Sequence, residues 1–332
     1  MDKFIKSINK DIKRNYKFYL VLLLFLLLFV IRLDYYVYSP GGLIDLTDRV
    51  NIENSFKQKG SFNMTYVSSR NGNIVNLLLS LIIPNWDIES VDEMRIDDED
   101  VDEIETRDRI KLEESSSESL IAAFTEANIP YTITSTEVKV TYVFSSAKTN
   151  LKANDIIKSI EGTSINNYDD LTNVLDKHKV GDKINIKVLR DNKERDCYST
   201  LISLDDKTAI GIGLIEMKNV ETNPKVDFVY KNNESGSSRG LMCALEIYNK
   251  ITEFDLTKGR VISGTGTIRE DGSVGAIGGV KYKLLGAAKE KASIFLVPSD
   301  NYEEAMKIKK ENNLKIEIIE ADNLHNVIEK LK

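Results

Sequence analysis

The stretch GAIGGVKYKLLGAA at residues 275–288 indicates most directly how the C-terminal part of this sequence folds. A double glycine precedes apolar residues that recur at helical spacing, which predicts a helix beginning near Val280. The helix would hold Lys281 at its start, among Ile277, Val280 and Leu284. Because apolar surroundings disfavour an ammonium charge, such a lysine loses its proton more readily than one in water.

A second glycine-framed segment lies earlier, ESGSSRGLMCALEIYNKI at residues 234–251. Gly236 and Gly240 bracket Ser238, and an apolar helix is expected to follow. Backbone N–H groups of such a loop, Ser237 included, can hold an oxyanion, and the start of a helix favours negative charge. The segment therefore has the features of a nucleophile loop.

The scarcity of histidine and cysteine limits the other chemistries. The two histidines, His178 and His325, are read as ordinary surface or helix residues, and no HExxH or zinc-ligand spacing occurs. Cys197 and Cys243 fall in different predicted domains, so no disulfide is forced and no metal site is expected. The sequence contains no Gly-x4-Gly-Lys-Ser/Thr phosphate loop, so no ATP site or other cofactor is expected. A serine–lysine dyad remains, a known variant of the catalytic triad.

The C-terminal region, residues 206–332, alternates strand-like and helical stretches. This pattern predicts an α+β domain with a mixed sheet and a hairpin over residues 261–274 that turns at Asp271-Gly272. The predicted strands cover residues 226–230, 294–297 and 315–319, and the predicted helices cover 239–251, 280–292, 302–311 and 324–331.

Residues 131–205 predict a compact module of strands, one helix and a hairpin across Asp191-Asn192. LKANDIIKSIEG from residue 151 and VGDKINIKVLRDNKE from residue 180 resemble the corresponding stretches of bacterial PDZ domains. Such domains bind peptide ends by strand addition. The loop near residues 135–138 is short and lacks the usual glycine, so peptide capture and a purely structural module both remain open.

The N-terminus carries an uncharged run, FYLVLLLFLLLFVI at residues 18–31. Extension to Val37 would give a membrane-spanning helix, with Arg32 snorkelling at its end. The basic residues of 1–17 predict a cytoplasmic N-terminus and an exported remainder at the cell membrane, by the positive-inside tendency. A cleaved signal peptide is the alternative, but no small-x-small cleavage site follows.

Between these parts lie strand-like residues and an acidic stretch. Residues 38–85 include the expected strands, and residues 86–130 form an acidic connector that leads into a helix over 117–127. The net charge of −7 and the absence of a basic stripe argue against a nucleic-acid partner.

The two glycine-framed segments together resemble the peptidase domain of Lon proteases, with its Gly-Pro-Ser-Ala-Gly and Gly-Gly-(Leu/Val)-Lys-x-Lys motifs. Residues 236–240 match the first motif and residues 278–283 the second. The resemblance implies Ser238 as nucleophile and Lys281 as general base, with Thr265 and Ser263 as candidates to bind the lysine amine.

The order of the whole chain resembles the bacterial membrane-anchored, PDZ-containing Lon-like proteases. This implies an ATP-independent serine endopeptidase that acts on extracytoplasmic peptides or membrane-proximal proteins, with the PDZ module assisting capture. It also implies that strands from residues 38–83 join the protease sheet, and it is compatible with a homo-oligomer, since Lon-type domains often form rings.

Two residues of the nucleophile loop depart from the family motif. Ser237 replaces proline and Arg239 replaces alanine. Arg239 would either lower the pKa of the lysine by like-charge repulsion or occlude the pocket. The alternative function is therefore an inactive, membrane-tethered scaffold that binds peptides. The expected parts are residues 1–17 (cytoplasmic), 18–37 (anchor), 38–85 (strands), 86–130 (connector), 131–205 (PDZ domain) and 206–332 (protease domain).

Overall fold

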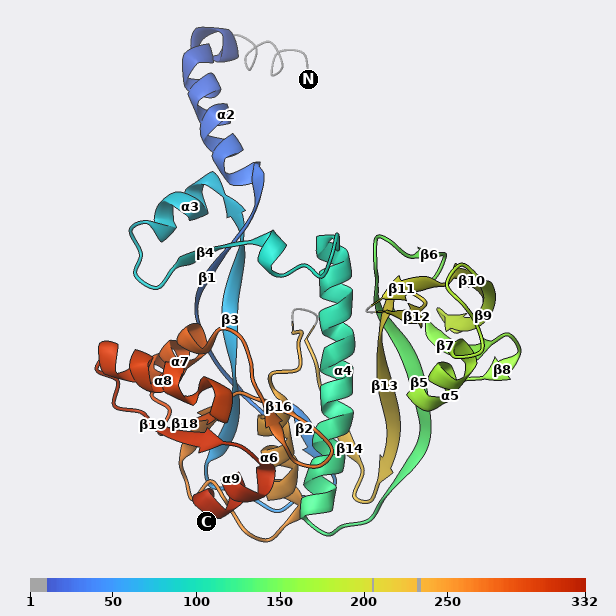
Figure 1. Cartoon of the computed structure of the whole chain (residues 1–332). Helices are drawn as coiled ribbons and strands as arrows, with labels where there is room; N and C mark the ends of the chain where they lie inside the picture. The colour runs from blue at the N-terminus through green and yellow to red at the C-terminus, as the bar shows by residue number, and fades with distance from the viewer. Residues whose placement is uncertain (1–10, 205, 232–233) are drawn as a thin grey trace, which may run out of the picture. The chain divides into compact units, whose positions relative to one another are not determined.

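A computed structural model describes residues 11–204, 206–231 and 234–332 (Figure 1). The first ten residues, which carry part of the predicted basic segment, lie outside the described residues. The chain divides into two compact units. One contains residues up to Pro40 together with Val67–Met94, and the other contains Gly41–Tyr66 together with Arg95–Lys332.

The first unit contains the apolar helix α2 (Tyr16–Val30), which has 15 residues and buries none of them. The expected continuation to Val37 is wrong, because β1 (Arg32–Asp45) begins directly after the helix. Tyr35, Tyr36 and Val37, all residue types that favour strands, pair instead with β4 (Asp87–Ser90). At ~1.5 Å per residue the helix is about 22 Å long. Of the helices in the described part of the chain, none is both long and apolar enough to cross a membrane.

A six-stranded sheet has the order β19-β18-β15-β3-β1-β4. β15 (Val261–Gly264) pairs in parallel with both β3 (Ser61–Asn73) and β18 (Ile294–Pro298), and β18 pairs in parallel with β19 (Glu317–Ala321). Because β4 pairs antiparallel with β1, the sheet is mixed, as predicted. Three strands from before the PDZ-like region (β1, β3 and β4) thus share one sheet with three from after it, and β3 pairs with β15 where the two sets meet.

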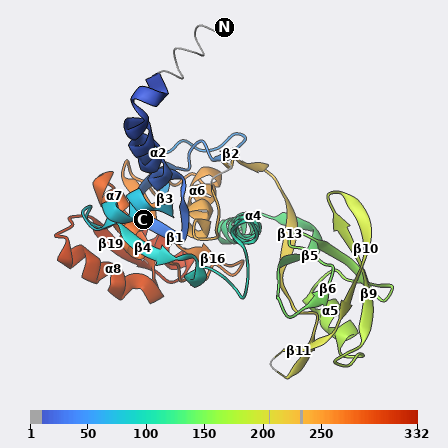
Figure 2. The same ribbon diagram turned by 90° about the horizontal axis from the view of Figure 1, so that it is seen from above.

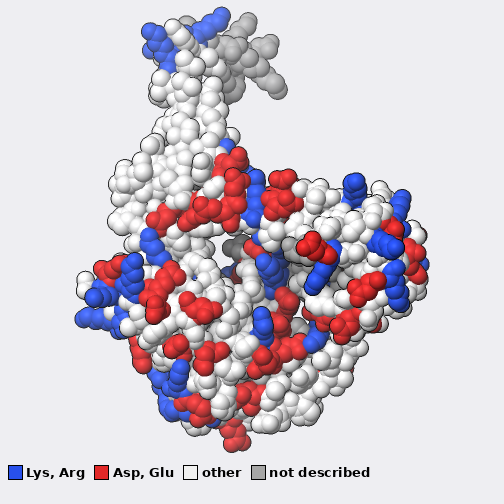
Figure 3. Space-filling view, in the orientation of Figure 1, with Lys and Arg blue, Asp and Glu red and all other residues white. Residues whose placement is uncertain are grey.

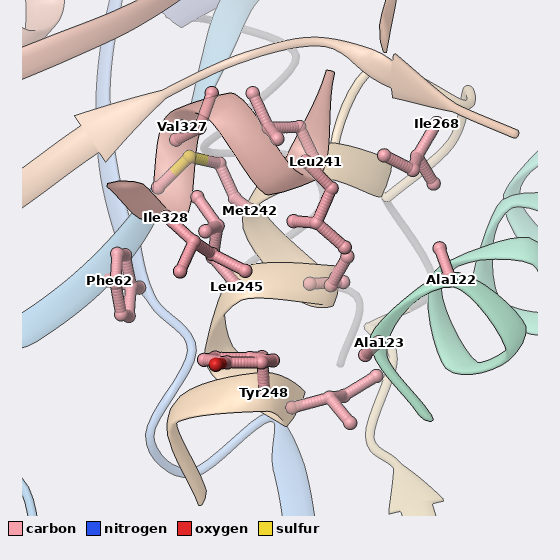
Figure 4. Packing of buried hydrophobic residues seen from close by; sticks show 14 of the residues in the cluster. Phe62, Ala122, Ala123, Leu241, Met242, Leu245, Tyr248, Ile268, Val327 and Ile328 are labelled. Carbon is pink, nitrogen blue, oxygen red and sulfur yellow. The ribbon is translucent and has the colours of Figure 1, made fainter. Parts of the chain in front are cut away.

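Helices bury both faces of this sheet. On one face α6 (Gly240–Ile251) and α9 (Leu324–Leu331) pack in a core that Figure 4 shows around Met242 and Leu245. On the other face α7 (Val280–Lys289) and α8 (Ser299–Glu311) pack against Phe295 and Val297. β18 reads as an unbroken apolar run because its alternate residues enter the two different cores.

The PDZ-like sheet has the strand order β13-β5-β7-β9-β10-β6, with β8 (Thr163–Ser164) beside β7. Its hairpin turns at Asp191-Asn192, where both residues have positive φ, as a tight hairpin turn requires. β13 pairs with β5 along its length although it lies beyond the predicted limit at residue 205. The remaining members are β5 (Tyr131–Val143), β6 (Lys148–Thr149), β7 (Ile156–Ile160), α5 (Tyr168–Leu175), β9 (Lys183–Arg190), β10 (Lys193–Thr200) and β13 (Ile212–Thr222).

The acidic connector is largely one long helix, α4 (Val101–Glu126), rather than a solvated linker. Asp100 and Glu103 form a capping box at its start, so part of the acidity serves to begin the helix. Its C-terminal half is mostly buried against α6, and Figures 1 and 2 both show it between α6 and β13. Short strand pairs complete the fold: β2 (Val50–Ile52) with β14 (Val226–Phe228), β11 (Ile202–Leu204) with β12 (Lys207–Ala209), and β16 (Thr267–Ile268) with β17 (Val274–Gly275).

Candidate active site

The predicted nucleophile loop, residues 236–240, ends where α6 begins. Gly236 has a φ of +85°, which favours glycine, and the N–H of Gly240 donates to the carbonyl of Ser237 at 3.1 Å. A Cβ on Gly240 would come within 2.9 Å of the backbone nitrogen of Ile268, so a side chain there would clash. Ser238 is partly exposed at this helix start, where the macrodipole favours negative charge.

The segment that follows β15 holds the backbone of Ser238 in place. Its carbonyl accepts a hydrogen bond from the N–H of Gly266 at 2.8 Å and another from Thr265 Oγ1 at 3.0 Å. Thr265 is fully buried. Two donors on one carbonyl oxygen restrict the orientation of the serine, which is what a nucleophile requires.

Lys283 is the lysine that lies beside this loop. Its Nζ donates to Thr265 Oγ1 at 3.1 Å, so a single hydroxyl connects the amine to the carbonyl of Ser238. The residue is only 5% exposed, and burial lowers the pKa of its ammonium from 10.5 to about 8. A substantial fraction of such a lysine is neutral near neutral pH and able to accept a proton.

Lys281 lies elsewhere on the same helix. It is partly exposed, and its Nζ lies 5.6 Å from the centre of the Tyr282 ring. Two residues along a helix differ by ~200° in direction, so Lys281 and Lys283 cannot face the same side. The sequence carried a signal for the choice, because Lys283 falls within the buried stripe formed by Val280 and Leu284, whereas Lys281 does not.

Of the two hydroxyl residues expected near the lysine, the structure brings only Thr265 to it. Ser263 is also fully buried, but its hydroxyl donates to the carbonyl of Ile294 in the neighbouring strand at 2.7 Å. Ser263 therefore contributes to the pairing of β15 with β18.

Arg239 is buried rather than directed into an open pocket. Its Nη2 donates to Ser116 Oγ of α4 at 2.6 Å, and its guanidinium lies 4.3 Å from the centre of the Tyr230 ring. The side chain is 6% exposed. Burial alone accounts for the lowered pKa of Lys283, without a contribution from the Arg239 charge. The substituted loop residue thus anchors the loop to a neighbouring helix.

Serines of α4 hold the same loop from the outside. Ser115 Oγ donates to the carbonyl of Ser237 at 3.1 Å, and Ser119 Oγ donates to the carbonyl of Gly240 at 2.9 Å. These contacts were not among the features predicted from the sequence. The run ESSSES at residues 114–119 was the available signal, since serines are unfavourable inside helices unless their hydroxyls have partners.

Among the described residues, no three His, Cys, Asp or Glu side chains are grouped so as to hold a metal ion. The two cysteines are buried as free thiols. His325 lies in α9, where its Nδ1 is 2.7 Å from a carboxylate oxygen of Glu126.

Comparisons with protein families match two separate parts of the chain. Residues 232–332 match the Lon protease (S16) C-terminal proteolytic domain, and residues 111–199 match the PDZ domain. The chain is also 30% identical over 119 residues to "Lon protease homolog 2, peroxisomal" of Caenorhabditis elegans. That match covers 36% of this chain but only 15% of the length of the worm protein.

Two of the solved structures similar to part of the chain are PDZ domains. One is the PDZ domain of an SdrC-like protein from Listeria monocytogenes, with 24% identity, a TM-score of 0.22, and coverage of 24% of this chain and 86% of that one. Another is the PDZ domain of an SdrC-like protein from Listeria innocua, with 27% identity, a TM-score of 0.22, and coverage of 24% and 92%.

Proposed function

We propose that this chain, a PDZ-containing Lon-like protease, is a serine endopeptidase that uses Ser238 as nucleophile and Lys283 as general base. The observation that carries the proposal is the buried Lys283 amine, joined through Thr265 to the carbonyl of Ser238 at the start of a helix. The proposal prefers Lys283 to the Lys281 of the motif assignment, because Lys283 is buried and its amine contacts Thr265.

The proposed reaction needs a neutral amine and a place for negative charge. Ser238 Oγ attacks the scissile carbonyl, and Lys283 accepts its proton and later gives it to the leaving amine. The positive end of the α6 macrodipole favours negative charge beside Ser238 and can stabilise the oxyanion. The N–H groups of Gly240 and Leu241 already donate to the carbonyls of Ser237 and Gly266. Thr265 keeps the lysine amine and the serine backbone in one arrangement throughout.

Arg239 was the feature that favoured an inactive scaffold, and its burial supports the protease instead. A guanidinium bound to Ser116 and stacked on Tyr230 stiffens the loop that proline would otherwise stiffen. The contacts of Arg239 thus restrain the loop in place of the proline of the family motif.

The PDZ module would assist capture through the outer edge of β13. Two carbonyls of this strand accept bonds from side chains: Leu214 from the hydroxyl of Tyr168 at 2.8 Å, and Lys218 from that of Ser117 at 2.6 Å. A peptide that adds a strand here would replace these hydroxyl bonds with backbone bonds. We propose that capture competes with α4 for the β13 edge.

The proposed protease acts without ATP and outside the cytoplasm, at the cell membrane. ATP independence is supported by the lack of a Gly-x4-Gly-Lys-Ser/Thr loop in the sequence. An extracytoplasmic site at the cell membrane is supported by the exposed apolar surface of α2 and the basic residues Lys13, Arg14 and Lys17 around its start. Alkaline washing of isolated membranes, followed by detection of the chain, tests the membrane attachment: the chain should stay with the membranes, and its release would refute that part of the proposal.

Digestion of casein and of a peptide library tests the enzymatic proposal. The wild-type chain should cleave without added ATP, and Ser238→Ala and Lys283→Ala should not. Ser237→Ala is the matched control, because it removes the neighbouring hydroxyl and should retain cleavage. Cleavage by Ser238→Ala at the wild-type rate would refute the assignment. Labelling with a fluorophosphonate, compared with Ser238→Ala, gives a second readout.

A further inference from the structure

Besides the apolar helix α2, the first unit has another exposed apolar segment, which contains none of the proposed catalytic residues. Residues 71–86 contain no charged side chain, and they form α3 (Ile74–Ser80) and the turn that follows it. α3 buries none of its residues, and Leu81 and Ile82 in the turn are 77% and 78% exposed. Leucine and isoleucine side chains left this open in water are costly, at about 25 cal/mol per Å² of apolar surface.

This surface is continuous with that of α2. The two helices are in contact, and Asn73, the N-cap of α3, donates from its side chain to the carbonyl of Phe29 near the end of α2. Figure 3 shows an uncharged surface over α2 and α3 on the face turned to the viewer. Together they present apolar side chains from the start of one helix to the turn after the other.

The surroundings of this surface favour lipid over a protein groove. α2 is apolar on every side, and such a helix is stable only in an apolar medium or a protein core, whereas none of its residues is buried. Lys13, Arg14 and Lys17 lie around its start and Arg32 just after its end, charges that suit anionic headgroups. Trp86 closes the turn with the Arg70 guanidinium 4.5 Å from its ring centre, and both residue types are typical of membrane interfaces.

We propose that α3 and the turn through Ile82 enter the interfacial region of the bilayer that α2 contacts, as a second lipid contact of this chain. Apolar side chains inserted to the boundary between headgroups and acyl chains add binding in proportion to the buried area. The short helix α2 and its neighbour α3 then both contact lipid. The lipid contact of α3 rests on the membrane location proposed above, but not on Ser238 or Lys283.

The full-length chain, reconstituted in vesicles of phosphatidylcholine and phosphatidylglycerol, provides the test. An Ile82→Cys variant carries a bimane label, and Val180→Cys, in a turn of the PDZ-like module with Val180 54% exposed, is the matched control. The native Cys197 and Cys243 are buried and should stay unlabelled. The label at position 82 should emit at shorter wavelength than that at 180, and lipids brominated on their acyl chains should quench only the former.

Trp86, the only tryptophan of the chain, gives a readout without any label. Its fluorescence should be quenched by brominated lipid in the wild type and in Val180→Asp, and much less in Ile82→Asp. Quenching of the position-82 label by aqueous iodide, as strong as at position 180, would overturn the proposal. Protection from both iodide and brominated lipid would also overturn it, because a protein would then cover the surface. Peptide cleavage by the same vesicles reports separately on the proposed protease activity.

Discussion

Replacing Lys283 should abolish peptide cleavage and at the same time stabilise the folded protein near neutral pH. The two effects have one cause, the burial that lowers the pKa of its ammonium from 10.5 to about 8. With a pKa near 8, roughly one lysine in ten is neutral at pH 7, whereas at the ordinary value of ~10.4 fewer than about one in a thousand is. Burial thus produces the base that the proposed reaction uses.

The stability effect follows from proton linkage. Because the pKa is lower in the folded state, the unfolded state binds more protons between about pH 8 and 10.5, and the contribution of Lys283 to stability rises with pH across that window. Below pH 8 the buried charge costs the folded state about 3 kcal/mol, as an order of magnitude, from ~1.4 kcal/mol per pKa unit. Lys283→Met should therefore raise the free energy of unfolding at pH 7 by up to that amount.

The activity assay is the initial rate of cleavage of a fluorogenic peptide across pH 6 to 9.5. The wild-type kcat/KM should rise with pH and level off above about 8, the pKa of Lys283. Lys283→Met and Lys283→Arg should lose ~10²–10⁴-fold, the usual contribution of a general base, and Lys281→Ala should keep both rate and profile. Urea unfolding at pH 7 and at pH 10 gives the stability arm.

Three results would refute this reasoning. Loss of cleavage in Lys281→Ala together with retained cleavage in Lys283→Met would assign the base to the exposed Lys281. The profile of the wild type could stay flat through pH 8. Lastly, Lys283→Met could be less stable at pH 7 than the wild type, which would mean that the buried lysine contributes contacts worth more than its desolvation costs.

Three further substitutions test the surroundings of the site. Arg239→Ala removes a buried hydrogen bond and the ring contacts of the guanidinium. It should lower the free energy of unfolding in urea by about 1–3 kcal/mol and also lower kcat. An unchanged kcat would show that the loop does not need this anchor. Gly264→Ala places a Cβ within 2.7 Å of that of Leu296, so overpacking of ~1–3 kcal/mol should lower the melting temperature, and a wild-type value would contradict the packing described. Ser117→Ala removes the hydroxyl that donates to the carbonyl of Lys218 on the β13 edge. Because such a bond is worth about 0.5–1.5 kcal/mol, peptide affinity measured by fluorescence anisotropy should rise by up to ~10-fold. A decrease in affinity would mean that α4 supports capture.

Several helices and strands of the C-terminal region could be predicted, because each is determined by residues adjacent to one another in the sequence. The apolar run of β18, the glycine before α7 and the apolar helix after the nucleophile loop each follow from a few adjacent residues. The choice between Lys281 and Lys283 required the direction of each side chain around α7. That direction is available from the buried stripe, although motif matching alone does not use it.

Other features depended on distant partners and could not be predicted locally. The burial of Arg239 needs Ser116, more than a hundred residues away, to receive its guanidinium. The length of α4 exceeds its apolar part because a capping box at Asp100 and Glu103 extends it through acidic residues. The end of α2 at Val30 reflects strand pairing of the next residues with β4, a competitor that an apolar run does not reveal.

The strands of the PDZ-like sheet lie in the sequence between two paired strands of the six-stranded sheet. This order determines which sheet can form first during synthesis. Ser61 of β3 pairs with Val261 of β15, and the whole PDZ-like sheet lies between them in the chain. At ~5–20 residues per second, β3 leaves the ribosome roughly 10 to 40 seconds before its partner strand exists. The inserted module can be complete by then, whereas β3 still exposes the edge that later pairs with β15, and an unpaired strand edge is prone to aggregation. The newborn chain is therefore most prone to aggregation while its PDZ-like sheet is already formed and its six-stranded sheet is not.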